Sequence, residues 1–491
     1  MSLILAIDQG TTNTKGLLVD QASCPIHRSA ATLRLVHPQP DFVEQDPSAI
    51  LNSVDQVIGE CLAFTKSKEQ AIAAIAISNQ RETVVAWDRI TGQPLSNAIT
   101  WQCRRATAVC NRLHDTGHEL LLRERTGLGN DPLFSAAKIA WLLENVDGLR
   151  ARTTAGEVCF GTIDSWVIHH LSDQHLCDHS NAARTQLFNL HTVDWDPQLA
   201  ELFGIPLASL PQLKTSSGFF ATCTLSPLQG VPILAAVGDS HAALAGHGCF
   251  RPGTVKATYG TGSSLMTLTA APTSNPESQL SQTIAWTTPS TTQFALEGNI
   301  TMTGSALTWL TEFLCLESVD NLADLAATVA DSGGVHFVPA MSGLGAPHWD
   351  SAARGLVSGL SRTSTRAHLA RAALDSIAFQ IRDVFDAMQR ECGLSFSALH
   401  CDGGATRNPA LMQLQADILG KPVHRSNTED LSALGAAHLA GLALGWWPAL
   451  DALPHPVTTF EPRLSTAARE SRYTAWQHAV AQTRLQPEPA L

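Results

Sequence analysis

The chain opens with two short apolar runs, residues 3–7 and 16–19, that predict a β-hairpin. The segment from Ile7 to Lys15 reads Ile-Asp-Gln-Gly-Thr-Thr-Asn-Thr-Lys, so the turn is rich in hydroxyls. Such a turn can offer backbone N–H groups and threonine hydroxyls to phosphate oxygens, and Asp8 can bind a divalent cation. An ordinary β-turn made of turn-favouring residues is the alternative. The chain contains no Gly-x-x-x-x-Gly-Lys-[Ser/Thr] motif, so phosphate binding here would not use a P-loop.

Similar turns recur in the second half of the chain. A strand-like run at 255–259 leads into Gly-Thr-Gly-Ser-Ser at 260–264, and an apolar strand resumes at 265–268. A third turn, Asp-Gly-Gly-Ala-Thr-Arg-Asn-Pro at 402–409, follows an apolar strand and precedes a helical pattern at 411–419. One such turn in each half, and a third before a helix, predict two similar domains that face one nucleotide.

Composition limits the classes of protein to consider. With 491 residues, 44% hydrophobic and 15% charged, the chain is too long for one core, and its composition is that of a globular protein. The net charge of −12 argues against nucleic acid or an acidic membrane surface as the main partner. No apolar stretch approaches the roughly 18 residues of a membrane span, and the chain starts with a strand rather than a signal peptide. The 11 cysteines form no Cys-x-x-Cys pair, which favours reduced thiols in a cytoplasmic protein.

Strand and helix patterns alternate along the chain, which predicts an α/β fold. Three glycines and a proline between residues 246 and 253 mark a domain boundary. We therefore expect domains at 1–247 and 248–450. The polar, proline-rich segment 451–491 is expected to form a surface helix and a tail.

Several polar residues follow predicted strands, where sites in open α/β folds are built. Asp239 comes after a strand at 231–237 and before a helix, so it can accept a proton from a hydroxyl that attacks phosphorus; N-capping is its ordinary role. Arg81 and Glu82 follow a buried strand at 71–77 and can bind adjacent hydroxyls of a polyol, or form a solvated ion pair. Trp101 can supply an apolar wall for such a ligand, or pack in the core.

Taken together, these segments resemble the FGGY carbohydrate kinases, and among them the glycerol kinases are the most similar. The resemblance spans about residues 3–447. The stretches that carry it are 7–15, Ser-Asn-Gln-Arg-Glu-Thr at 78–83, Trp-Gln-Cys-Arg-Arg at 101–105, Phe-Gly-Thr-Ile-Asp-Ser-Trp at 160–166, Tyr-Gly-Thr-Gly at 259–262, Gly-Leu-Gly-Ala-Pro-His-Trp-Asp at 343–350, 355–380 and Asp-Gly-Gly-Ala at 402–405. The resemblance implies an actin-like fold: two ribonuclease-H-like domains with ATP and sugar in the cleft between them.

The resemblance also implies a role for each matched residue. The N-terminal domain would bind the polyol or sugar and supply Asp239 as general base, and the C-terminal domain would bind the nucleotide. Asp8 and Asp239 would hold Mg²⁺. The β- and γ-phosphates of ATP would be met by Thr11, Thr12, Lys15, Gly260 and Thr261. The adenosine would be met by Gly304, Gly404, Ala405 and Asn408. The substrate would be met by Arg81, Glu82, Trp101, Leu133, Asp239, Ser240 and Ser264. A homodimer or homotetramer is implied as well.

Four positions depart from the glycerol kinase pattern. Glycerol kinases usually have Tyr at Leu133, Gln at Ser240, Phe at Ser264 and Arg at Lys15. Three pocket positions are thus smaller, which predicts room for a longer polyol or a small sugar with four or five carbons. Glycerol itself is the alternative, if neighbouring side chains refill the space. A non-catalytic, nucleotide-dependent sensor on the same fold is a second alternative. A dinucleotide-dependent oxidoreductase is disfavoured, because no Gly-x-Gly-x-x-Gly follows the first strand.

Overall fold

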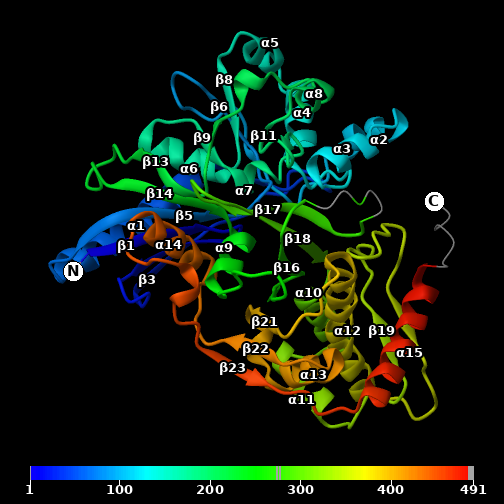
Figure 1. Cartoon of the computed structure of the whole chain (residues 1–491). Helices are drawn as coiled ribbons and strands as arrows, with labels where there is room; N and C mark the ends of the chain where they lie inside the picture. Colours follow the sequence, from blue (N-terminus) through cyan, green and yellow to red (C-terminus); the bar gives the residue numbers. More distant parts are fainter. Residues whose placement is uncertain (1, 273–274, 276–277, 485–491) are drawn as a thin grey trace.

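Two sheets of related topology organise the chain in the computed structural model, which describes residues 2–272, 275 and 278–484 (Figure 1). In the first sheet the strand order is β13-β14-β5-β1-β2-β3. Strands β1, β2 and β3 form an antiparallel meander, and β5 and β14 continue the sheet in parallel with β1. The strands are β1 (Ser2–Gln9), β2 (Asn13–Val19), β3 (Pro25–Thr32), β5 (Ala71–Asn79), β13 (Ser217–Thr222) and β14 (Pro232–Gly238).

The second sheet repeats this arrangement, with the order β17-β18-β16-β15-β21-β22-β23. Strands β15, β16 and β18 form the antiparallel meander, and β21 and β22 add in parallel with β15. The recurring turns therefore do mark two related α/β domains. The strands are β15 (Val255–Tyr259), β16 (Ser263–Thr269), β17 (Ser281–Thr287), β18 (Thr292–Ile300), β21 (Leu399–Asp402), β22 (Val423–Ser426) and β23 (Val457–Phe460).

Long helices connect the meander of each sheet to its parallel strands. Helix α1 begins after Asp46, whose carboxylate accepts from the N–H of Ser48, with proline at the first helical position. Helix α12 is the equivalent crossover in the second domain. The helices that flank the second sheet are α10 (Gly304–Phe313), α11 (Val319–Ala327), α12 (Arg366–Cys392), α13 (Pro409–Leu419) and α15 (Thr466–Arg484). Those that pack with the first sheet are α1 (Pro47–Ser67), α6 (Ile163–Ser172), α9 (Asp239–Gly246) and α14 (Leu431–Ala443).

Helices α9 and α14 pack together between the two sheets (Figure 1). They approach closely because their crossing is lined by glycine: a Cβ on Gly435 would lie 1.8 Å from the carbonyl oxygen of Ala242, and one on Gly246 would lie 2.4 Å from that of Leu431. Helix α14 thus lies in the C-terminal part of the sequence but packs against β1, β5 and β14 of the first sheet. The predicted domain 248–450 contains α14, but α14 packs with the first sheet. The predicted domain bounds therefore differ from the division of the molecule by packing.

A smaller unit between β5 and β13 stands on the first sheet (Figure 1). Its core is formed mainly by helices α2, α4 and α8 and strand β8. Its helices are α2 (Thr107–Asp115), α3 (Glu119–Thr126), α4 (Ser135–Asn145), α5 (Leu149–Thr154), α7 (His179–Ala182) and α8 (Pro197–Leu202). Paired short strands outside the two large sheets are β4 (Glu44–Gln45) with β7 (Ala98–Ile99), β6 (Val85–Asp88) with β8 (Val158–Gly161), β9 (Leu176–Asp178) with β12 (Gln212–Lys214), β10 (Phe188–Asn189) with β11 (Asp194–Trp195) and β19 (His336–Val338) with β20 (Leu356–Ser358).

The C-terminal segment contributes more to the fold than its polar composition indicates. Strand β23 pairs with β22 and extends the second sheet. Helix α15 buries Tyr473 and Trp476 in the second core, where Trp476 is 1% exposed and stacks on Phe379. Within the described residues, no helix combines the length and apolar character needed to cross a membrane.

Candidate active site

The first hairpin presents its polar groups at the end of β1. Asp8 lies opposite Lys15 across the β1–β2 pair, and its Oδ1 accepts from the Ser78 hydroxyl at 2.9 Å. Burial raises the pKa of Asp8 to about 6; Lys15 opposes this rise and Asp239 adds to it. Lys15 forms a 3.0 Å ion pair with Asp430, directly before α14. The structure therefore gives Lys15 a protein partner in addition to the phosphate contact that the sequence predicts.

Thr11 and Trp101 are brought together, although the sequence predicts different ligands for them. The indole N–H of Trp101 donates to the Thr11 hydroxyl at 2.9 Å, and that hydroxyl donates to Oε1 of Gln80 at 3.3 Å. Gln80 is 2% exposed, whereas Trp101 is 37% exposed. Trp101 is thus an exposed side chain anchored on the hairpin turn, not a core residue. Thr12 is exposed beside Thr11.

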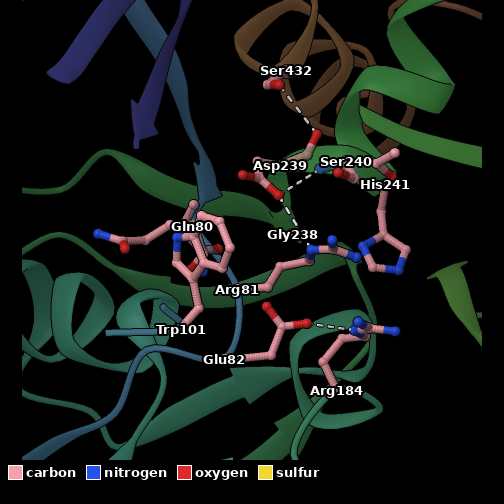
Figure 2. Close-up of polar contacts among 12 residues, drawn as sticks. Gln80, Arg81, Glu82, Trp101, Arg184, Gly238, Asp239, Ser240, His241 and Ser432 are labelled. Carbon is pink, nitrogen blue, oxygen red and sulfur yellow. Dashed lines mark hydrogen bonds and ion pairs between the residues drawn. The ribbon is translucent and has the colours of Figure 1, made fainter. Parts of the chain in front are cut away.

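Asp239 is the first residue of α9, directly after β14, as the sequence predicts (Figure 2). Its Oδ1 accepts from its neighbour Ser240 N–H at 2.6 Å and lies 3.3 Å from Nε of Arg81. No described residue forms a hydrogen bond with Oδ2, and 39% of the side chain is exposed. Burial raises the pKa of Asp239 above its ordinary value, and Arg81 opposes this rise. The arrangement leaves one carboxylate oxygen accessible for a proton.

Arg81 and Glu82 do not pair with each other; each is fixed by a buried partner. Arg81 donates from Nη1 and Nη2 to the two oxygens of Glu297 at 3.0 and 2.8 Å. Glu82 accepts from Nε of Arg184 at 2.6 Å through Oε1 (Figure 2). Arg184 also lies 2.9 Å from Glu297, which is fully buried. Burial alone would raise the pKa of Glu297, but Arg184 and Arg81 hold it well below its usual range.

The three positions with smaller side chains have different environments. The Ser264 hydroxyl donates to Oε1 of Glu297 at 2.9 Å. The Ser240 hydroxyl is partly exposed and forms no hydrogen bond with any described residue. Leu133 is partly exposed in the segment before α4, where its N–H donates to Asp131 at 2.8 Å. Ser264 thus completes a buried ion cluster, whereas Leu133 and Ser240 keep partly exposed side chains.

The predicted nucleotide residues of the second domain are brought together by close backbone contacts. The N–H of Gly304, at the start of α10, donates to the carbonyl of Gly260 at 3.0 Å, and the carbonyl of Thr261 accepts from Ser305. A Cβ on Gly304 would lie 2.5 Å from the Gly260 oxygen, so this contact requires glycine. Gly403 has φ +98°, and a Cβ on it would lie 2.4 Å from the carbonyl oxygen of Tyr259, the residue before this turn; Gly404 and Ala405 follow directly.

Asn408 has a structural task in this group. Its side chain accepts from the N–H groups of Ala410 and Leu411 and caps α13. Its amide oxygen is therefore used within the protein, and only its NH₂ group is available for an adenosine.

Sequence reasoning missed Arg184 and Glu297, which hold Glu82 and Arg81 in place. Glu297 carried a signal, because an acid within the apolar strand Phe-Ala-Leu-Glu-Gly must find a partner if that strand is buried. Arg184 lies in a short loop after α7, and its sequence context gave no such signal.

The carboxylates of Asp8 and Asp239 fit a magnesium ion whose remaining ligands would be phosphate oxygens and water. Among the described residues, no group of three or more His, Cys, Asp or Glu side chains is arranged to hold a metal. Mg²⁺ in kinases is usually held by one or two carboxylates, phosphate oxygens and water. The charge of Asp239 helps to raise the pKa of Asp8, so the two carboxylates interact. A cation bound between them would favour the charged form of both.

Comparisons with known proteins identify the family of the chain. Models of the N- and C-terminal domains of the FGGY family of carbohydrate kinases match residues 3–246 and 255–444. A glycerol kinase of Stenotrophomonas maltophilia is 46% identical over 488 residues, 98% of each chain. An apulose kinase of Pectobacterium atrosepticum is 46% identical over 495 residues, 99% of each chain. The crystal structure of Plasmodium falciparum glycerol kinase with ADP has a TM-score of 0.92 at 31% identity and covers 99% of each chain.

The fold, the site and these matches define an ATP-dependent phosphotransferase with an alcohol group as acceptor. The chain belongs to the FGGY family of carbohydrate kinases. The predicted fold class and family are thereby confirmed.

Proposed function

We propose that this kinase transfers the γ-phosphoryl group of ATP to a primary hydroxyl of a polyol or small sugar longer than glycerol. The observation that carries the proposal is the set of groups around Asp239. Oδ2 of Asp239 and Oε2 of Glu82 form no hydrogen bond with any described residue, while their other oxygens are held by the protein. Two fixed carboxylates with one free oxygen each suit an acceptor with neighbouring hydroxyls.

In the proposed reaction, the oxygen of the acceptor hydroxyl bonds to the γ-phosphorus, and Oδ2 of Asp239 accepts the proton of that hydroxyl. The bond between the γ-phosphorus and the β,γ-bridging oxygen breaks, and ADP leaves. Arg81 donates to, and Glu82 accepts from, further hydroxyls, with Trp101 against the carbon face. Asp8 and Asp239 would hold Mg²⁺, which would neutralise charge on the phosphates. The nucleotide would be bound through Thr11, Thr12, Lys15, Gly260, Thr261, Gly304, Gly404, Ala405 and Asn408.

The length of the acceptor is inferred from the three smaller side chains. Leu133 and Ser240 are partly exposed, and the Ser240 hydroxyl is free to bind an additional acceptor hydroxyl. The relative named for apulose supports an acceptor other than glycerol, at the same 46% identity as a glycerol kinase. Glycerol stays the second candidate, because pockets discriminate weakly against missing methylenes, by about 1–3 kcal/mol each. We further expect a cytoplasmic homodimer or homotetramer; the cysteines, all free thiols, agree with a reducing compartment.

The test is an ADP-release screen with Mg·ATP against glycerol and C4–C6 polyols, ketoses and aldoses. A preference in kcat/KM for a longer acceptor supports the proposal, and best turnover on glycerol contradicts the proposed length. The double variant Leu133→Tyr, Ser240→Gln should shift preference toward glycerol. Absence of turnover on every acceptor would contradict the proposed function as a whole.

A further inference from the structure

Helix α4 carries a lysine that the proposed chemistry does not use. Lys138 is completely buried, and no carboxylate of the described chain forms an ion pair with it. Its ammonium group instead donates to two backbone carbonyls: that of Glu82, at 3.0 Å, and that of Leu133. Both carbonyls belong to segments that the proposed function places around the acceptor.

A buried ammonium group is unfavourable and calls for an explanation. Burial lowers the pKa of Lys138 to about 7, and the nearby Glu82 opposes this. The surrounding core is apolar, so methionine or leucine would fill the same space without the cost of desolvating a charge. The protonated and neutral amines both have enough N–H groups for two carbonyls. The side chain is therefore explained by its donors rather than by its charge.

The carbonyl of Glu82 needs such donors because its backbone is strained. Glu82 has φ +61°, in the left-handed region that residues with a Cβ rarely adopt. The Ser135 hydroxyl donates to the same carbonyl at 3.2 Å, and Arg184 holds the carboxylate at 2.6 Å. Glu82 is thus held at both ends, by α4 and by Arg184, so that its Oε2 is directed to one place.

Leu133 is held by the same ammonium group. It occupies the position at which glycerol kinases usually have tyrosine, in the segment whose Asp131 pairs with Arg104 at 2.9 Å. Because Lys138 binds both carbonyls, it fixes the separation between the Glu82 segment and the Leu133 segment.

We propose that Lys138 is a positioning residue that sets the width of the acceptor subsite by holding Glu82 and Leu133 at a fixed separation. The inference rests on the proposed function. It predicts that loss of the ammonium group affects acceptor binding and leaves the nucleotide subsite, which lies on other elements, unchanged.

The test compares Lys138→Met with two control variants on the same helix. Lys138→Met keeps the length of the side chain and removes its donors. Ser135→Ala removes only the second donor to Glu82. Ile139→Val is a buried apolar change that weakens packing without removing a hydrogen-bond donor. KM for the acceptor, KM for ATP, kcat and the melting temperature are measured for each.

We expect Lys138→Met to raise the acceptor KM by about tenfold to a hundredfold, since small misplacements of binding groups have effects of that size. The KM for ATP should change less than about threefold, and Ser135→Ala should raise the acceptor KM by a few-fold. Ile139→Val should leave both KM values unchanged. An unchanged acceptor KM in Lys138→Met, with only a lower melting temperature, would overturn the inference. If that variant does not fold, an unchanged acceptor KM in Ser135→Ala overturns it instead. If the wild-type enzyme shows no turnover on any acceptor, the proposed function itself is contradicted.

Discussion

The buried cluster around Glu297 allows a quantitative prediction for Glu297→Gln. Oε2 accepts from Arg81 at 3.0 Å and lies 2.9 Å from Nη1 of Arg184 in an ion pair, and Oε1 accepts from Arg81 and Ser264 at 2.8 and 2.9 Å. In the variant, the new NH₂ group faces at least one hydrogen-bond donor of Arg81 whichever way the amide turns. Two buried guanidinium groups also lose one of their two carboxylate partners, since Arg81 keeps Asp239 and Arg184 keeps Glu82.

Breaking a buried ion pair by removing one partner costs about 3–5 kcal/mol, which lowers the melting temperature by about 6–10 °C if a domain of about 250 residues unfolds as a unit. The acceptor KM should also rise, because Arg81 loses its two-point anchor. The assay is thermal unfolding followed by circular dichroism, with steady-state kinetics at a temperature at which both proteins are folded.

The matched control is Glu429→Gln. Glu429 pairs with Arg28 at 2.6 Å, but its side chain is 67% exposed. An exposed ion pair contributes at most about 1 kcal/mol, so this variant should melt within about 2 °C of the wild type. If the two variants lose the same small amount of stability, the claim that the Glu297 cluster is held by buried charge is refuted.

Three further outcomes follow from the site. Asp239→Asn should lower kcat by about 10²- to 10⁴-fold and leave ATP affinity, measured by calorimetry, unchanged; loss of ATP binding would contradict its role as base. Because the pKa of Asp8 is about 6, its carboxyl becomes protonated as pH falls through this value. The Mg²⁺ concentration for half-maximal rate should then rise about tenfold per pH unit below 6, and a flat dependence would exclude Asp8 as a ligand. Trp101→Phe keeps the aromatic wall but removes the bond to Thr11, so KM for ATP should rise about two- to tenfold while the acceptor KM changes little. The reverse pattern would show that the indole N–H acts on the acceptor.

The sequence allowed local features to be predicted well. The hairpin of β1 and β2 and the place of Asp239 after a strand depend on neighbours in the chain, and the structure contains both. The acid within an apolar strand indicated that Glu297 needs a partner, but it did not indicate that this partner is Arg81, which comes from the other domain. The packing of α14 on the first sheet was missed for a similar reason. An Ala/Leu-rich helix is apolar on every side, so its sequence pattern does not indicate which element it packs against.

The same buried contacts bear on how acceptor specificity can change within this architecture. Arg81 is fixed by Glu297, and Glu82 is fixed by Arg184 and Lys138. If either residue moved, a buried charge would lose its partner or the carbonyl of Glu82 would lose its hydrogen bond. Such fixed groups favour catalysis because they need no reorganisation when charge develops. Residues that only shape the remaining space, such as Leu133 and Ser240, carry no such constraint. Acceptor length should therefore be altered most readily by changes at these partly exposed positions, and substitutions in the charged cluster should reduce turnover on every acceptor alike.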